Sequence, residues 1–279
     1  MSGMVGVGDR RVLEMAKRVR HTFVVCAYKE SPYLEECLRS LLAQSVKSRI
    51  LIVTSTPNEF IQSLAEQYRI PYFVNPGEGG ITQDWNFGYA CAAGSKYITI
   101  AHQDDVYEKT YLEKALRLLE NSKRPLIFFS DYYEIREGMR VESNKLLKVK
   151  RLMLLPMRIK AFRGSRWVRR RILSLGSPIC CPSVTYAADH LPKVIFQNGF
   201  RACEDWETWE MISKLSGDFL YSTELLMGHR IHADSETSAI IGDHKRTDEE
   251  YKMYCKFWPK PVAKLLARAY ASGQKSNEL

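Results

Sequence analysis

The chain has 279 residues, of which 45% are hydrophobic, and a formal net charge of +9. This length and composition fit one large α/β domain, or one domain with a subdomain, around a real core. The seven cysteines, an odd number without a Cys-x-x-Cys pair, argue against a disulfide framework or structural zinc and indicate reduced, cytoplasmic thiols. No run of 18 apolar residues is present and the N-terminal residues lack an apolar core, so neither a membrane span nor a signal peptide is expected.

The first half of the chain alternates apolar, β-branched runs with segments of helical periodicity. Buried parallel strands read as continuous apolar runs, whereas a helix repeats its apolar residues every three or four positions. Strands are expected at residues 21–27, 50–54, 71–74, 97–101 and 126–130. Helices are expected after Ser31 as N-cap and at residues 59–68, 81–93 and 110–121. The alternation predicts an α/β fold with a mostly parallel sheet, whose ligands bind at the carboxyl ends of the strands.

After about residue 140 the alternation stops. A helix is expected over residues 204–215, a strand over 220–230 and a basic amphipathic helix over 258–270. These later elements predict a C-terminal helical region beside the sheet.

Two acidic clusters about a hundred residues apart are the candidates for chemistry. His102-Gln103-Asp104-Asp105 ends an expected strand, and an imidazole and a carboxylate at alternate positions, His102 and Asp104, suit Mn²⁺ or Mg²⁺ with positions left open for phosphate oxygens. The plain alternative is a strand end whose acids cap the next turn. Glu204-Asp205-Trp206-Glu207 can supply a general base, or can match the dipole of a helix N-terminus. Together the clusters favour metal-assisted group transfer.

Several segments, in this order, resemble glycosyltransferase family 2, the inverting nucleotide-sugar enzymes with a GT-A fold. The resemblance covers roughly residues 20–237. It rests on VVCAYKES at 24–31, the Gly- and Asn-rich stretch at 75–94, HQDD at 102–105, EDW at 204–206 and RIHADSET at 230–237. Two departures stand out. His102 replaces the first Asp of the family's DxD motif, and Thr54-Ser55-Thr56-Pro57-Asn58 replaces an acidic turn.

The resemblance implies a role for individual residues. The general base is Asp205, with Glu204 beside it, and the metal ligands are Asp104 with His102 and His232. The implied donor-binding residues are Ala27, Tyr28, Glu30, Thr54, Ser55, Asp84, Asn86, His102, Gln103 and Asp104. The implied acceptor-binding residues are Trp206, Ser177 and Pro178.

For several of these residues a second interpretation stays open. His102 can ligate the metal or contact the nucleotide, and His232 can be a ligand or a buried, hydrogen-bonded histidine. Asp84 and Asn86 can face the sugar or hold a loop-to-helix junction. His229 is interpreted as structural.

The implied reaction moves a sugar from a UDP- or dTDP-sugar to a glycan or lipid-linked acceptor in cell-surface polysaccharide biosynthesis, with a Mn²⁺ or Mg²⁺ cofactor. The expected parts are an N-terminal extension at 1–20, a nucleotide-sugar half at 21–140, an acceptor half at 141–245, and a basic helix and tail at 246–279. A nucleotidyltransferase, which would need a Gly-rich loop after the first strand, and a membrane- or RNA-associated module with a degenerate site are the alternatives. Homo-oligomerisation is left open.

The positive charge is concentrated in one segment. No acidic residue lies between Glu142 and Asp189, and residues 145–171 hold 11 Lys and Arg. A solvated basic face is one interpretation. The other is attachment through residues 145–175, including Arg169, Arg170 and Arg171, to an anionic membrane, where each basic residue contributes about 1 kcal/mol. We therefore expect a cytoplasmic protein, peripheral at the inner face of the membrane. Nucleic-acid binding is not expected, because no reading module is present.

Overall fold

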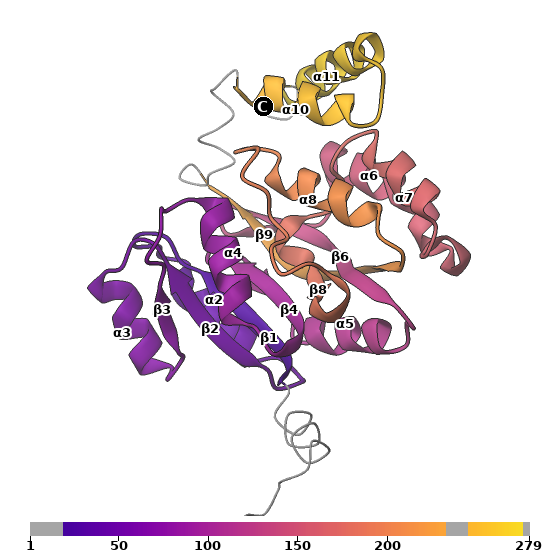
Figure 1. Cartoon of the computed structure of the whole chain (residues 1–279). Helices are drawn as coiled ribbons and strands as arrows, with labels where there is room; N and C mark the ends of the chain where they lie inside the picture. Colours follow the sequence, from indigo (N-terminus) through magenta and orange to yellow (C-terminus); the bar gives the residue numbers. More distant parts are fainter. Residues whose placement is uncertain (1–18, 233–244, 276–279) are drawn as a thin grey trace, which may run out of the picture.

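The computed structural model describes residues 19–232 and 245–275 (Figure 1). Most of the expected 1–20 extension and residues 233–237 of the family resemblance lie outside this range. The described strands are β1 Val19–Cys26, β2 Arg49–Thr54, β3 Tyr72–Val74, β4 Ser95–His102, β5 Val106–Tyr107, β6 Pro125–Arg136, β7 Met139–Val141, β8 Thr185–Ala187 and β9 Asp218–Ile231. The described helices are α2 Leu34–Leu42, α3 Glu59–Gln67, α4 Ile81–Cys91, α5 Tyr111–Glu120, α6 Lys145–Met153, α7 Arg166–Leu173, α8 Glu204–Ser213, α10 Lys245–Cys255 and α11 Lys260–Lys275.

Within the described range the strands form one nine-stranded sheet, in the order β3-β2-β1-β4-β8-β6-β9-β5, with β7 beside β6. The first four strands are parallel, as the sequence predicts, and Cys26 at the end of β1 lies opposite both Val53 and His102. Side chains of β1 alternate between two hydrophobic cores, since Val24 belongs to one and Phe23 and Val25 to the other. A strand buried on both faces explains the unbroken apolar run.

The second part of the sheet is mixed. The short strand β8 lies antiparallel between β4 and β6, β6 pairs with β9 in parallel, and β5 pairs with β9 antiparallel. The sequence analysis missed β5, β7 and β8, which have only two or three residues and no readable period. The pairing of β5 with β9 matters for the site, because Val106 faces Gly228 and so brings residues 102–105 next to residues 229–232.

The helix starts show one wrong prediction. The N-cap of α2 is Tyr33, and the hydroxyl of Ser31 instead accepts a 3.3 Å hydrogen bond from the Tyr33 amide in the preceding turn. Asn58 does cap α3, because its side chain accepts a bond from the Ile61 amide.

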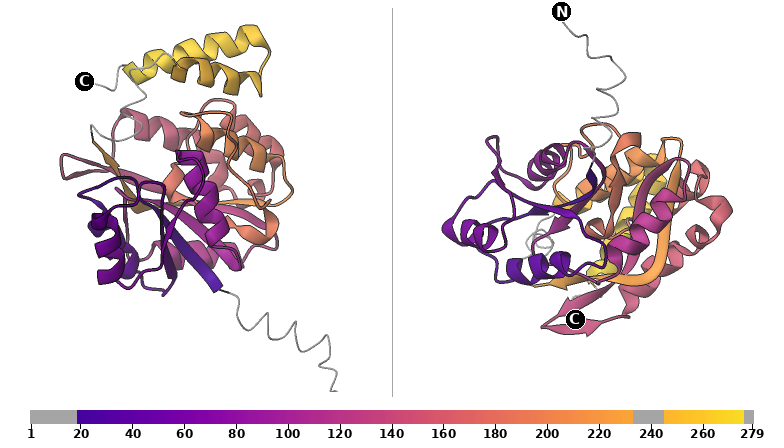
Figure 2. Two further views of the ribbon diagram at one scale, coloured as in Figure 1. Left: turned by 60° about the vertical axis from the view of Figure 1, so that its left-hand side comes forward. Right: turned by 90° about the horizontal axis from the view of Figure 1, so that it is seen from below.

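The C-terminal helices pack beside α7 and α8 (Figure 2). Their aromatic side chains surround Trp206, whose ring centroid lies 5.1 Å from that of Tyr254. The hydroxyl of Tyr254 and the indole of Trp258 donate to the carbonyls of Leu175 and Ser174, just after α7. Among the helices that the structure describes, none combines the length and the apolar character needed to cross a membrane.

His21, at the start of β1, is a buried histidine that makes the fold sensitive to acid. Its ring nitrogens lie 2.7 Å from Ser48 Oγ and 2.9 Å from Thr99 Oγ1, and burial lowers its pKa from 6.5 to about 3. Because the folded pKa is the lower one, the stabilisation is present above pH 6.5 and is lost as the pH falls toward 3. Between pH 7 and pH 4 we expect the native chain to lose about 3 kcal/mol more unfolding free energy than His21→Gln.

Urea unfolding of both proteins at the two pH values measures this difference. The glutamine variant will be less stable at neutral pH, so the comparison concerns the change with pH and not the absolute values. Parallel losses in the two proteins would contradict the assignment to His21.

Candidate active site

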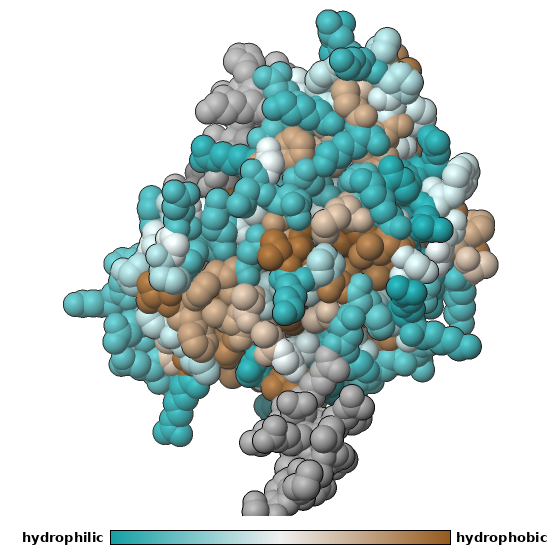
Figure 3. All heavy atoms as spheres, in the orientation of Figure 1, coloured by the Kyte–Doolittle hydropathy of each residue, from teal (hydrophilic) through white to brown (hydrophobic). Residues whose placement is uncertain are grey.

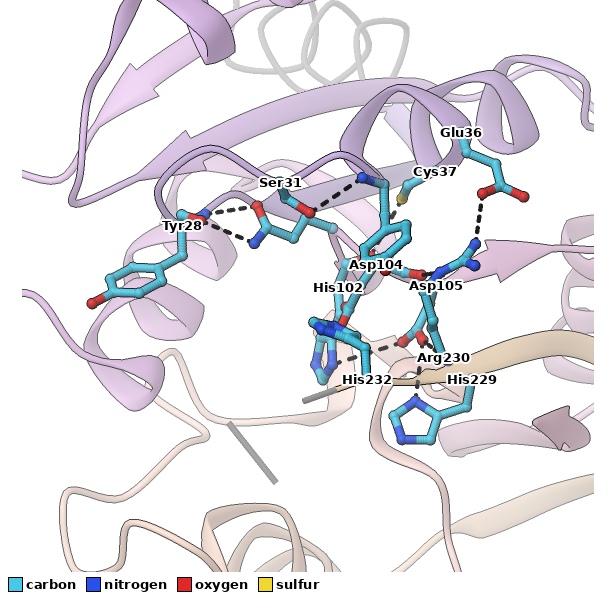
Figure 4. Close-up of polar contacts among 12 residues, drawn as sticks. Tyr28, Ser31, Glu36, Cys37, His102, Asp104, Asp105, His229, Arg230 and His232 are labelled. Atoms are coloured by element: carbon cyan, nitrogen blue, oxygen red, sulfur yellow. Dashed lines mark hydrogen bonds and ion pairs between the residues drawn. The ribbon is translucent and has the colours of Figure 1, made fainter. Parts of the chain in front are cut away.

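The first acidic cluster lies in the turn that joins β4 to β5. Asp105 is fully buried, and its Oδ1 accepts hydrogen bonds from the Arg230 amide at 2.9 Å and from His229 Nδ1 at 3.1 Å. Asp104 is half-buried, and its Oδ2 lies 3.0 Å from His232 Nε2. The end of β9 therefore holds both carboxylates in place, as Figure 4 shows.

Arg230 connects this turn to α2. Its Nε donates to the carbonyl of Asp104 at 2.8 Å, its Nη2 pairs with Glu36 at 2.6 Å, and its guanidinium lies over the ring of Tyr33 at 4.4 Å. The ring of Tyr33 also contacts His232, with centroids 5.0 Å apart. These contacts fix the positions of residues 229–232 relative to Asp104.

Three side chains of the turn can hold a metal ion. His102, Asp104 and Asp105 each offer one ligand atom, and these atoms all lie within 4.8 Å of one another. Over the described residues, His102 Nε2 and Asp105 Oδ2 are buried without a hydrogen-bond partner. Such atoms are costly to bury unless something else satisfies them, and one imidazole nitrogen with carboxylate oxygens is a donor set for a divalent cation. The residues present therefore fit a Mn²⁺ or Mg²⁺ ion.

The two histidines near Asp105 differ in charge preference. Burial lowers the pKa of His102, which keeps its imidazole neutral and able to donate a lone pair. The ring of His102 stacks on Trp85, with centroids 5.2 Å apart. Burial also disfavours the charged form of His229, but the adjacent Asp105 carboxylate outweighs it and raises the pKa of His229 above its usual value.

The second acidic cluster opens α8 and reaches the same site. Glu204 is buried, and Asp205 Oδ2 accepts a 3.5 Å hydrogen bond from Ser177 Oγ. Burial raises the pKa of the Cys181 thiol, and the carboxylates of Asp205, Glu204 and Asp105 raise it further. Both clusters, which the sequence separates by a hundred residues, are thus close enough to Cys181 for their charges to act on its thiol.

Loops after β1, β2 and β4 form the predicted donor side. The Tyr28 backbone and the Gln103 side-chain amide exchange two hydrogen bonds of 2.9 and 3.0 Å. The amide of Lys29, a non-glycine residue with a φ of 54°, donates to Thr56 Oγ1 at 2.6 Å. Ala27 and Thr54 are buried, whereas Tyr28 and Glu30 are exposed.

Asp84 and Asn86, both on α4, make contacts within the protein. The carboxylate of Asp84 accepts from Ser55 Oγ at 2.6 Å and from Asn75 Nδ2 at 2.8 Å, and so joins the loops after β2 and β3. The side-chain amide of Asn86 bonds to the carbonyl and the amide of Phe196. Both residues thus join α4 to neighbouring loops, as in the interpretation that they hold a loop-to-helix junction.

Two of the predicted acceptor-binding residues are buried. Trp206 is 2% exposed and its indole donates to the Leu173 carbonyl at 2.9 Å, so the prediction that it contacts the acceptor is wrong: the ring packs on the C-terminal helices. Pro178 is buried, and Ser177 contacts Asp205.

Two residues near the metal cluster were not assigned these roles from the sequence. Asp105 was not among the predicted metal ligands, although it offers the third ligand atom of the cluster. His229 was interpreted as structural, although it bonds to that carboxylate. The adjacent acids in HQDD were a signal for Asp105, whereas the role of His229 depends on the β5–β9 pairing.

Comparison with solved structures shows the same fold in glycosyltransferases. A mannosyltransferase from Pyrobaculum calidifontis, in complex with GDP-Man and Mn²⁺, matches with a TM-score of 0.63 and 14% identity over 91% of this chain and 69% of that chain. The Staphylococcus aureus protein TarS, residues 1–349 in complex with UDP-GlcNAc, matches with a TM-score of 0.60 and 14% identity over 89% and 70%. At these identities the likeness establishes the GT-A fold.

Sequence comparison identifies the family. An uncharacterized glycosyltransferase of Haemophilus influenzae is 22% identical over 247 residues, which cover 82% of this chain and 71% of that protein. The model of glycosyl transferase family 2 matches residues 22–174, more than half of the chain. With the fold and the acidic site in place, the chain belongs to glycosyl transferase family 2 and is a glycosyltransferase.

Proposed function

We propose that this glycosyltransferase moves a sugar from UDP or dTDP to a hydroxyl group of a glycan or lipid-linked acceptor, with inversion at the anomeric carbon. The observation that carries the proposal is the cluster of His102, Asp104 and Asp105, whose ligand atoms all lie within 4.8 Å of one another. A donor diphosphate beside this cluster would meet an acceptor hydroxyl beside the Glu204–Asp205 pair. Cell-surface polysaccharide biosynthesis at the inner face of the membrane is the process that we propose for it.

His102, Asp104 and Asp105 would hold a Mn²⁺ or Mg²⁺ ion. Such an ion, when bound, neutralises negative charge on diphosphate oxygens. The complex of the mannosyltransferase with GDP-Man and Mn²⁺ supports this assignment. His232 and Arg230 position Asp104, and His229 positions Asp105, because each donates to or contacts the carboxylate or its backbone.

Asp205 is the proposed general base. It lies in the first turn of α8, where the helix dipole favours the ionised carboxylate that a base requires, and Ser177 Oγ orients one of its oxygens. Glu204 precedes it and is buried, so we assign to it the positioning of the acceptor or of Asp205. A single base without a covalent nucleophile implies one displacement and hence inversion.

The donor-side loops would contact the nucleotide through Tyr28, Glu30, Ser55 and the backbone of Ala27 and Thr54. The reciprocal bonds between Tyr28 and Gln103 support this, because they fix the strand ends relative to the metal cluster.

Metal-dependent nucleotide binding tests the proposal. We expect UDP or dTDP to raise the thermal midpoint only with Mn²⁺ or Mg²⁺, because a ligand at 100 times its dissociation constant stabilises by about 2.7 kcal/mol. Asp104→Asn should weaken metal binding and so abolish most of this metal-dependent rise of the thermal midpoint. Asp248→Asn, an exposed aspartate on α10, is the matched control and should behave like the native chain.

The product of the reaction separates the proposal from its alternatives. A glycosyltransferase incubated with its donor and an acceptor releases a nucleoside diphosphate. Release of pyrophosphate would show a nucleotidyltransferase, and neither release nor a nucleotide-dependent shift would show a binding module.

A further inference from the structure

We propose that α6, α7 and the two 3-10 turns between them present a docking face for an anionic lipid surface. The turns are Leu155–Arg158 and Lys160–Phe162. We call this the 145–171 face. Figure 1 places α6 and α7 next to each other, on the opposite side of the molecule from the edge strand β3.

Apolar side chains are exposed along the whole of the 145–171 face. Their exposed fractions are 48% for Val149, 65% for Leu152, 42% for Leu155, 51% for Ile159 and 70% for Trp167. Isolated exposed apolar residues are ordinary, but a series of them on consecutive elements marks an interaction surface. Figure 3 shows this upper right part of the molecule as largely hydrophilic, so the apolar groups are interleaved with polar ones.

The polar groups between them are cationic. On α6, Lys145, Lys148, Val149 and Leu152 are all exposed and share one helix face by their spacing. Arg158, Lys160 and Arg166 continue the exposed positive charge along the turns and into α7. No acidic residue occurs in the sequence between Glu142 and Asp189, so the segment supplies no carboxylate of its own to this face.

The basic residues of this segment fall into two groups. Lys150, Arg151, Arg169 and Arg170 turn toward the protein, where their head groups bond to Tyr132, the Glu142 carbonyl, the carbonyls after α8 and Glu210. Lys145, Lys148, Arg158, Lys160, Arg166 and Arg171 remain exposed, and Arg163 is half-buried. The proposal therefore depends on the second group, and the earlier expectation that Arg169 takes part in membrane binding is wrong, because this side chain is 1% exposed.

A lipid surface fits this face better than a nucleic acid or a second copy of the chain. Trp167 could stack on a base, but most of the exposed apolar side chains of the face, Leu152 and Ile159 among them, are aliphatic. Aliphatic side chains gain by entering the headgroup–acyl boundary but cannot stack on bases. A symmetric dimer through the face would bring two sets of exposed cations against each other.

Docking would bring the acceptor side toward the membrane. The loop that follows α7 carries Ser177, whose hydroxyl bonds to Asp205. A lipid-linked acceptor could then reach the base without leaving the membrane; this consequence, unlike the docking itself, rests on the proposed function.

Vesicle co-sedimentation of the full chain tests the docking. The probes are phosphatidylcholine vesicles with and without 30% phosphatidylglycerol, at low and at high salt, without donor or metal. A triple variant, Lys148→Gln/Lys160→Gln/Arg166→Gln, tests the charges. We expect its affinity for the anionic vesicles to fall about a hundredfold, because each charge removed lowers the affinity by about tenfold or less. The matched control is Lys47→Gln/Arg117→Gln/Lys123→Gln, which removes the same charge from exposed positions elsewhere.

The apolar part needs its own pair of variants. Leu152→Ser should weaken binding about tenfold, whereas Phe73→Ser, on β3 at the far edge of the sheet, should not change it. An equal loss of vesicle affinity in both triple variants would overturn the proposal. Vesicle binding of the same strength with and without phosphatidylglycerol would overturn it as well. Tighter binding to RNA than to vesicles at the same salt would indicate a nucleic-acid surface, and a dimer dissociated by Leu152→Ser would indicate a second copy; either result would also overturn it.

Discussion

Asp205→Asn is expected to lower the turnover of sugar transfer by a factor of about 10² to 10⁴, the range that a positioned general base contributes. Asparagine has the shape of aspartate and can still accept the hydrogen bond from Ser177, but it cannot take a proton from the acceptor hydroxyl. Because Asp205 lies on α8 and the donor-side loops follow β1, β2 and β4, nucleotide binding should be unchanged. Steady-state rates and thermal shifts with nucleoside diphosphate and Mn²⁺ measure the two properties.

Two outcomes would contradict this assignment. Transfer at a near-native rate would show that another group accepts the proton, and Glu204→Gln would then be the next variant to measure. Loss of nucleotide binding would show that Asp205 belongs to the donor side. Asp248→Asn again serves as the carboxylate-to-amide control, since this exposed residue lies on α10.

Arg169→Met is expected to lower the free energy of unfolding by roughly 3–5 kcal/mol, because three carbonyl groups lose their donor at a cost of about 1–3 kcal/mol each, partly offset by water. The guanidinium lies at the end of α8, where it donates to the carbonyls of Ser213, Leu215 and Gly217, and its carbon lies 4.8 Å from the centre of the Phe219 ring. Burial lowers the pKa of Arg169 to about 10, so it stays charged at neutral pH. A methionine fills the space but leaves three carbonyl oxygens without a donor.

Urea unfolding with matched substitutions measures this loss. Arg166→Met, one turn earlier on the same helix and exposed, should change stability by less than about 0.5 kcal/mol. Arg169→Lys keeps the charge but not the planar fork of donors, so it should fall between the two. A loss from Arg169→Met no larger than that from Arg166→Met would rule out a capping role.

Arg169 also shows where reasoning from the sequence stops. Composition identifies a basic segment, and helical spacing separates exposed Lys148 from buried Leu147, but it does not say which arginine meets the end of another helix. Ser213, Leu215 and Gly217 are more than forty residues away in the sequence, and only the packing of α7 on α8 brings them together. The same limit applies to Trp206, whose position beside acidic residues favoured the acceptor, whereas the C-terminal helices bury it.

The elements that the sequence predicted well are those with a long, regular pattern. The apolar runs of β1, β2 and β4 and their parallel pairing follow from buried strands alternating with helices. The placement of His102 and Asp104 at a strand end followed from the same reasoning. The short strand β5 has no such pattern, yet its pairing with β9 delivers His229 and His232 to these residues, so the histidine contacts could not be derived from local sequence.

The C-terminal helices, which pack on Trp206, also make polar contacts that determine the position of α8. Residues of the C-terminal region hold α8, the helix of the proposed base, in place. Lys256 pairs with Glu207 at 2.6 Å. The Glu249 carboxylate accepts hydrogen bonds from the amides of Arg201 and Ala202, just before α8. The family match ends at residue 174, before all of these residues. The C-terminal helices α10 and α11 therefore hold the start of α8 through contacts in which the loops after β1, β2 and β4 take no part, so a change in these helices should shift α8 and leave the hydrogen bonds of those loops in place.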